Sequence, residues 1–224
     1  MNKYLFPIYA VILGYIIVII TKNRPIKNIK LLLAFSGAFL LSLTVFDLLP
    51  EVYEHLDAKA TGLFIMIGIL LQIFLEFFSK GAEHGHVHET EPNTVFPWIL
   101  FISLCVHSFL EGFPIHQHND MVYGVLVHKI PIAILITTFL IRSNYSTFIT
   151  FVFLILFGIM TPLGTLISNE TTFLTPYLYY INALVIGIFL HISTIILFES
   201  SEAHKFNLSK LLVIITAVAI AYFM

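Results

Sequence analysis

The sequence predicts an all-α integral membrane protein built as a bundle of eight transmembrane helices. Hydrophobic residues make up 58% of its 224 residues and charged residues only 11%, whereas soluble domains carry roughly 25% charged residues. The mean hydropathy is +0.96. The apolar stretches lack the alternation typical of barrel strands, and in lipid a helix satisfies its own backbone hydrogen bonds. We therefore expect residues 1–224 to form a single polytopic membrane domain.

Eight stretches match, or nearly match, the roughly 20 apolar residues that a spanning helix needs. The first is too long for the apolar region of a signal peptide, no A-x-A cleavage site follows it, and its basic cluster comes after it. The last stretch is short. The predicted spans are 4–21, 29–49, 61–79, 95–115, 120–141, 146–168, 175–199 and 208–223.

Lysine and arginine are distributed unevenly between alternate loops. Because cytoplasmic loops carry the excess of basic residues, we assign the basic side to the cytoplasm and expect both termini on the non-cytoplasmic side. Lys3 and Lys59 fall on the opposite side, and Lys129 lies within a span. The lack of large loops favours a bacterial inner (plasma) membrane. The other eight of the eleven basic residues are Lys22, Arg24, Lys27, Lys30, Lys80, Arg142, Lys205 and Lys210.

The cytoplasmic loop 80–92, "KGAEHGHVHETEP", is rich in glycine, glutamate and histidine, a composition typical of flexible, solvated segments. Its His84, His86 and His88 alternate with small residues. Such tracts can capture transition metals weakly. A merely polar linker is an equally good interpretation.

Ionisable residues within spans are rare and usually mark a pathway through the protein. His107 and Glu111 are spaced i, i+4 and therefore share one helix face. The short connection to the next span predicts that the two helices are antiparallel neighbours, and Pro114 is expected to break or kink the first. His128 then reaches a similar depth. Two imidazoles and a carboxylate suit zinc, iron, manganese or cobalt, so we predict a buried metal site.

Other polar residues extend this site into a candidate pathway. His116, His118 and Asp120 lie between the fourth and fifth spans, where they either collect cations or form a hydrated turn. Asp47 is placed at the outer mouth. Glu76 and His191 are placed in the inner half. Structural hydrogen bonding is an equally open interpretation of these last three residues.

At these motifs the chain resembles the ZIP (ZRT/IRT-like) divalent metal ion transporters over nearly its whole length. The fourth-span pattern of that family, H-N/S-x-x-E/D-G, is similar to "HSFLEG" (107–112), and "HKIP" (128–131) is similar to the fifth-span pattern in its His-Lys-x-Pro variant. Weaker similarities are "DLLPE" (47–51), "TPLG" (161–164) and the histidine loop "EHGHVH" (83–88).

The resemblance implies eight spans, external termini and metal movement into the cytoplasm through a site between spans four and five. By position, His107, Glu111 and His128 match metal ligands. Ser108 replaces a common Asn ligand, and Lys129 replaces a common acidic ligand of a second metal. A lysine ammonium there would neutralise Glu111 and repel a second ion, so we predict a single-metal site. Ile132 and Thr161 also replace frequent ligands.

The predicted function is a divalent metal transporter that is not an enzyme, with zinc favoured and iron, manganese or cadmium as alternatives. An intramembrane zinc-dependent hydrolase and a metal-responsive membrane sensor are competing interpretations. We expect no cofactor other than the transported Zn²⁺ or a similar cation. The expected partners are metal ions and the lipid bilayer, and a homodimer is left open. The net charge of −2 argues against nucleic acid.

Overall fold

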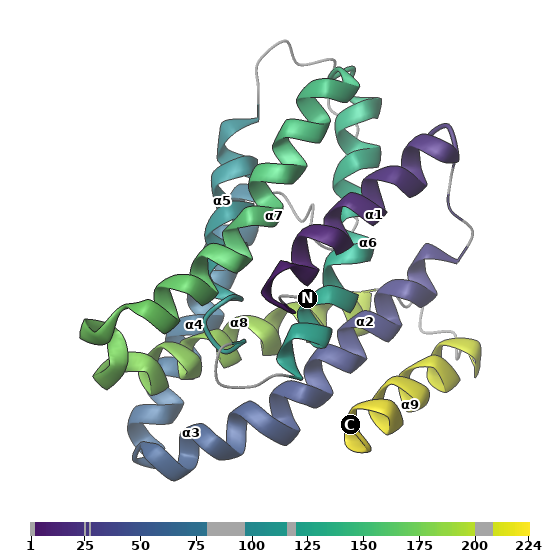
Figure 1. The fold of residues 1–224 in the computed structure, drawn as a ribbon. Coiled ribbons are helices and arrows are strands. Elements are labelled where there is room, and N and C mark those ends of the chain that lie inside the picture. The colour runs from purple at the N-terminus through teal and green to yellow at the C-terminus, as the bar shows by residue number, and fades with distance from the viewer. Residues whose placement is uncertain (1–2, 25, 27, 80–96, 116–119, 200–207) are drawn as a thin grey trace.

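The computed structural model describes residues 3–24, 26, 28–79, 97–115, 120–199 and 208–224, and this part of the chain is helical apart from short turns (Figure 1). Each of the eight predicted stretches contains a helix. The predicted capture residues His84, His86 and His88, and the mouth residues His116 and His118, lie outside the described residues.

The helices follow one another with few other elements between them. A short 3₁₀ turn (Lys3–Leu5) leads into the first helix, a π-helical turn (Thr44–Leu48) joins α2 to α3, and a second 3₁₀ turn (Thr172–Tyr177) precedes α8. The helices are α1 (Phe6–Ile20), α2 (Ile29–Leu43), α3 (Leu49–His55), α4 (Ala58–Ser79), α5 (Trp98–Leu110), α6 (Met121–Arg142), α7 (Thr147–Glu170), α8 (Leu178–Glu199) and α9 (Leu208–Tyr222).

Five helical stretches of the described chain are long and apolar enough to cross a membrane: Ile29–His55, Ala58–Phe78, Met121–Arg142, Thr147–Glu170 and Thr172–Phe198. The apolar helices α1, α5 and α9 are shorter. A helix of 15 residues, the length of α1 and α9, rises about 22 Å, less than the roughly 30 Å of a bilayer's hydrocarbon core. Full crossing by these three helices stays a prediction.

Two helix ends differ from the predicted ones by a turn or more, and both lie near a proline. The fourth predicted span runs to residue 115, but α5 ends at Leu110 and residues 111–115 form a buried turn. Pro114 lacks an N–H and disfavours the helical conformation of Phe113, so the helix cannot continue. The second span runs beyond residue 49 to His55. There the π-helical turn ends at Leu48, and Pro50 lies in the first turn of α3, where a missing N–H is tolerated.

The bundle divides into two groups of helices in close contact (Figure 1). In one, α1 packs along α6 and α7, and α5 packs along α7; in the other, α4 packs along α8, and α2 packs along α8 and α9. Contacts of α2 with α6 and of α4 with α5 join the groups. The predicted neighbours α5 and α6 meet through side chains, with a hydrogen bond of 2.9 Å between Ser108 and Lys129. The helices packed most closely against them are others, namely α7 and α4 for α5, and α1 and α2 for α6.

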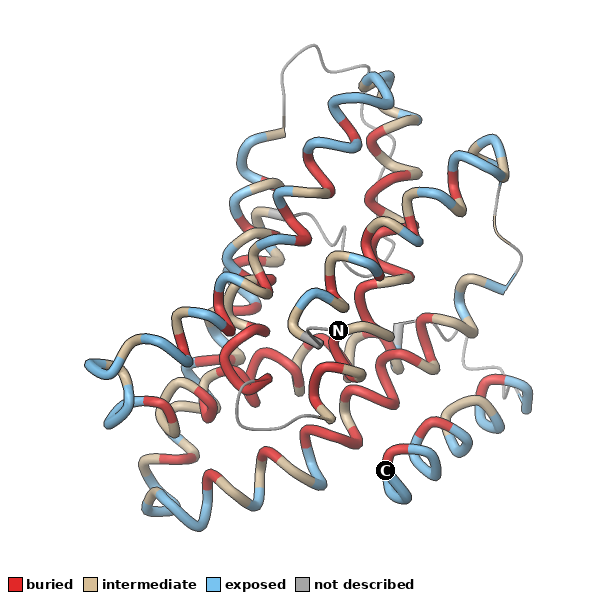
Figure 2. Tube along the Cα trace, viewed as in Figure 1, coloured by how far each residue is buried: buried red, intermediate tan, exposed pale blue. Residues whose placement is uncertain are grey.

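Helix α6 is the most buried of the five long helices, and much of its trace is red in Figure 2. Its N-terminal half contributes Val122 and Val125 to one apolar cluster, and its C-terminal half contributes Ile132 and Ile136 to another. The polar residues His128 and Lys129 lie between these two sets along the helix. The fold therefore places His128 and Lys129 of α6 between two apolar clusters.

Candidate metal centre

The last turn of α5 carries two of the predicted ligands. His107 and Glu111 are one turn apart, and the Nε2 atom of His107 lies 2.6 Å from the Oε1 atom of Glu111. Glu111 is the residue at which the helix ends. Both residues are almost fully buried, with 2% and 1% of their surface exposed. The i, i+4 spacing thus brings an imidazole and a carboxylate together inside the bundle.

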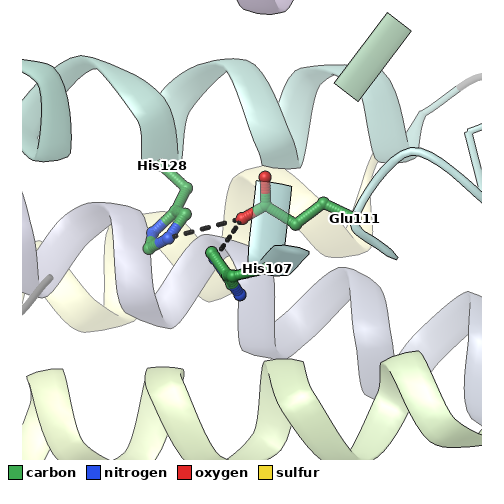
Figure 3. Close-up of side chains that lie close together, drawn as sticks. All are labelled: His107, Glu111 and His128. Atoms are coloured by element: carbon green, nitrogen blue, oxygen red, sulfur yellow. Dashed lines mark ion pairs between the residues drawn. The ribbon is translucent and has the colours of Figure 1, made fainter. Parts of the chain in front are cut away.

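The third ligand approaches from α6. The Nε2 atom of His128 lies 3.8 Å from the same Oε1 atom of Glu111. In Figure 3 both imidazoles point at this one carboxylate oxygen. One ligand atom from each of His107, Glu111 and His128 can be chosen so that all lie within 4.8 Å of one another. The structure therefore brings together the three residues that the sequence singled out.

The chemistry of these three donors suits a transition-metal dication. Neutral imidazole nitrogen and carboxylate oxygen are both zinc ligands, with Zn–N distances of about 2.0–2.1 Å. In a tetrahedral site, ligand atoms lie about 3.3–3.4 Å apart. The atoms here lie on both sides of that value, with 2.6 Å between Nε2 of His107 and Oε1 of Glu111 and up to 4.8 Å across the group, so the side chains would move to hold an ion. Three protein ligands leave a fourth position open for water, as in exchangeable rather than structural sites.

Lys129 contacts the other edge of the same carboxylate. Its Nζ atom lies 2.7 Å from Oε2 of Glu111 and donates a hydrogen bond of 2.9 Å to the Oγ atom of Ser108. It also lies 4.3 Å from the centre of the Phe157 ring, a cation–π distance. Only 1% of Lys129 is exposed, so this lysine does not extend to the membrane surface and belongs to the centre.

Hydroxyl groups on α7 fasten the end of α5 to its neighbour. Thr161 donates to the carbonyl oxygen of Ser108 at 2.9 Å, Thr165 to that of Gly112 at 2.8 Å, and Ser168 to that of Phe113 at 3.2 Å. These carbonyls belong to the last turn of α5 and the turn after it, where helical partners run out. The backbone on both sides of Glu111 is thereby fixed against α7.

Two glycines allow α5 and α7 to approach this closely. A Cβ atom on Gly112 would overlap the carbonyl oxygen of Thr161, and one on Gly164 would overlap that of Phe109. Sequence reasoning missed Thr165, Ser168 and Phe157 as neighbours of the centre. Thr161, Thr165 and Ser168 are spaced so that they share one face of a predicted span. This spacing could have identified the hydroxyl groups of Thr165 and Ser168 as hydrogen-bond donors to a neighbouring helix.

The remaining predicted residues lie elsewhere in the bundle. Glu76 of α4 and His191 of α8 pair with each other, with 2.8 Å between Oε2 and Nε2. Asp47 lies in the π-helical turn, and Asp120 directly precedes α6. Both are partly exposed. Ile132, which replaces a frequent ligand, is packed in an apolar cluster.

Comparison with known proteins identifies the family to which this chain belongs. The sequence profile described as "ZIP Zinc transporter" matches residues 79–224, a range that contains His107, Glu111 and His128. "Protein zntD" of Dictyostelium discoideum is 24% identical over 152 residues, and the match covers 57% of this chain and 22% of that relative. The chain thus spans about a fifth of that relative's length. With most of its length matched by the profile, the chain belongs to the ZIP zinc transporter family.

Proposed function

We propose that the protein moves a divalent metal cation, zinc in the first place, into the cytoplasm by alternating access around His107, Glu111 and His128. The observation that carries this proposal is the buried convergence of two imidazoles and a carboxylate between helices of a membrane bundle. Buried ionisable groups in membrane proteins usually serve transport. Family membership supports the same function.

One metal per centre follows from Lys129. The oxygen of Glu111 that faces away from the histidines is paired with its ammonium group, which stands where a second dication would need a ligand. A cation there repels another cation at short range. We therefore expect one metal bound by His107, Glu111 and His128 in protein that lacks residues 80–92.

The outer and inner polar residues complete the proposed route. Asp47 and Asp120 would receive the ion, and Glu76 with His191 would pass it toward the cytoplasm. The histidines of the 80–92 loop would capture it there. Each step is open to test by single substitution.

A zinc-dependent hydrolase is less well supported. Such an enzyme needs a general base near the metal in addition to its ligands. Among the described residues, Glu111 is the one acidic side chain that is buried, and in the proposed site it serves as a ligand. The carrier accounts for all three residues without a further group.

The first test measures uptake of radioactive zinc by proteoliposomes containing the purified protein. We expect His107→Ala and Glu111→Gln to reduce uptake at least about tenfold, since each removes one of three ligands. The matched controls are His55→Ala and Glu54→Gln, because both residues are exposed at the end of α3. These should transport like the unchanged protein. Full uptake by the His107 and Glu111 variants would refute the proposal.

A further inference from the structure

Resting on the proposed carrier function, we propose that Lys129 is a tethered counter-ion for Glu111. In the ion-free carrier its ammonium group balances the charge of Glu111 in place of the metal. The empty protein can then change back to the conformation that is open to the outside. In the loaded carrier the same group weakens metal binding and promotes release.

The carboxylate of Glu111 has two edges with different partners. Its Oε1 atom faces the Nε2 atoms of His107 and His128, at 2.6 and 3.8 Å. Its Oε2 atom faces the ammonium group of Lys129 at 2.7 Å. A metal bound by the two histidines would therefore meet one edge while the lysine stays on the other. The metal ion and the ammonium group of Lys129 would therefore both be attracted to the single negative charge of Glu111.

The formal charges of the centre already cancel in the absence of an ion. Among the described residues, Glu111 and Lys129 are the buried acid and base at this place, and their formal charges of −1 and +1 sum to zero. The side chains of both are at most 1% exposed. An unpaired carboxylate at such a position would be strongly disfavoured, whereas a hydrogen-bonded pair is tolerated. The empty site is therefore compatible with a closed, water-excluding state.

Lys129 also has partners that do not depend on Glu111. Its Nζ atom donates to the Oγ atom of Ser108 at 2.9 Å and lies over the ring of Phe157 at 4.3 Å. Ser108 is itself within hydrogen-bond distance of the Phe157 carbonyl oxygen and the Thr161 hydroxyl, at 3.0 Å each. When a metal attracts the carboxylate, the ammonium group keeps these contacts. The side chain can thus remain buried throughout the cycle.

This arrangement has two consequences for a carrier. In each cycle an alternating-access carrier changes from its outward-open to its inward-open conformation with the ion bound and changes back without it. The change without the ion is easiest when the buried charges cancel. The loaded site holds a dication beside an ammonium group, and their repulsion lowers the affinity. Transport requires binding that is firm enough to load and loose enough to release. One lysine would serve both needs.

The first measurement is equilibrium zinc binding to purified protein in detergent. Lys129→Met keeps the length of the side chain and removes its charge, so we expect the zinc affinity to rise at least about tenfold. Ser108→Ala removes a contact that draws the ammonium group away from Glu111, so the affinity should fall. A purely structural role would lower the affinity in both variants. Unchanged or weaker binding by a folded Lys129→Met protein would overturn the proposal.

The second measurement separates net movement from exchange in proteoliposomes. Net uptake into metal-free vesicles requires the empty carrier to return, whereas exchange of labelled external zinc for internal zinc does not. We expect Lys129→Met to lose most of its net uptake and to keep exchange, and Lys129→Arg, which keeps the charge, to retain more net uptake than Lys129→Met. Equal net uptake by Lys129→Met and the unchanged protein would contradict the role in return.

Two further results keep this test distinct from that of the carrier function itself. Absence of both uptake and exchange in the unchanged protein would overturn the carrier proposal, and the lysine proposal with it. Normal transport by the unchanged protein together with normal affinity and net uptake in Lys129→Met would overturn only the lysine proposal. If Lys129→Met does not fold, Lys129→Gln takes its place, because it removes the charge and keeps a hydrogen-bonding side chain; tighter zinc binding by it would support the proposal, and unchanged or weaker binding would contradict the competition between lysine and metal.

Discussion

At the scale of single residues, hydroxyl groups hold the backbone beside the charged groups of the centre. Glu111 lies where α5 ends, and a carboxylate on a loose turn would hold a metal poorly. Thr165 donates to the carbonyl oxygen of Gly112, the next residue, at 2.8 Å. The hydroxyl is buried with 2% of the residue exposed. A side chain that contacts no metal therefore helps to fix the position of a proposed ligand.

Replacing Thr165 by Val tests this positioning role. Valine keeps the shape and removes the donor, so the bundle should lose about 0.6–1 kcal/mol. The corresponding decrease in the thermal midpoint in detergent is about 2–4 °C. Zinc affinity should fall as well, because the backbone beside Glu111 loses a fixed point. Thr165→Ser restores the donor and is expected to recover most of both properties; equal loss in the two variants would show that the hydroxyl is not responsible.

At the scale of helices, the contact between α5 and α7 determines where the end of α5 can lie. Gly112 and Gly164 face each other's helices with no room for a Cβ atom. Small residues at such contacts let backbones approach closely, which is how helices associate when lipid removes the hydrophobic driving force. The spacing of the two helices therefore sets the position of Glu111 relative to His128.

Gly164→Ala should push α5 and α7 apart although it is remote in sequence from every proposed ligand. Its Cβ atom would overlap the backbone oxygen of Phe109, and overpacking of this kind costs about 1–3 kcal/mol. We expect lower thermal stability and reduced zinc uptake. Gly62→Ala is the matched control, because a Cβ atom there meets no atom within 4 Å. A Gly164→Ala protein as stable and active as the control would rule out this account.

At the scale of the whole molecule, the distribution of basic residues predicts the orientation of the bundle in the membrane. Basic residues gather at one side of the predicted spans, and the positive-inside rule therefore predicts that both termini lie outside the cytoplasm. Helix α7 tests this assignment well, since it is long and apolar enough to cross a membrane and begins and ends at exposed residues, Thr147 and Asn169–Glu170.

Cysteines at the two ends of α7 should react from opposite sides of the membrane. The background is Cys105→Ala, which removes the single cysteine of the chain, with either Thr147→Cys or Asn169→Cys added. In intact cells a membrane-impermeant maleimide should label the variant at 169 and leave the variant at 147 unlabelled until the cells are permeabilised. The reverse pattern would invert the orientation and with it the proposed direction of transport.

The sequence could predict those features that depend on residues close together in the chain. His107, Glu111 and His128 were identifiable because polar residues in apolar spans, one turn apart or beside a proline, are visible without any packing information. The contacts of Lys129 with Ser108 and Phe157, and those of Thr165 and Ser168 with α5, depend on which helices adjoin. The short connection predicted that α5 and α6 adjoin, and they do so through Ser108 and Lys129, but it did not predict that each packs more closely against other helices. The pairing of Glu76 with His191 joins residues 115 positions apart, beyond the reach of any local pattern.

The π-helical turn at Thr44–Leu48 has a consequence for the charges of the second span. From the buried Leu40, a regular α-helix would direct residues seven and eleven positions later to the same face, and these are the acids Asp47 and Glu51. The structure instead buries Leu48 and Val52, both at 0% exposure, one residue further along. The wider turn rotates the C-terminal part of the helix so that leucine and valine enter the core and two carboxylates stay within reach of water. An aligned relative with a regular helix here would need one residue fewer to keep the same face buried.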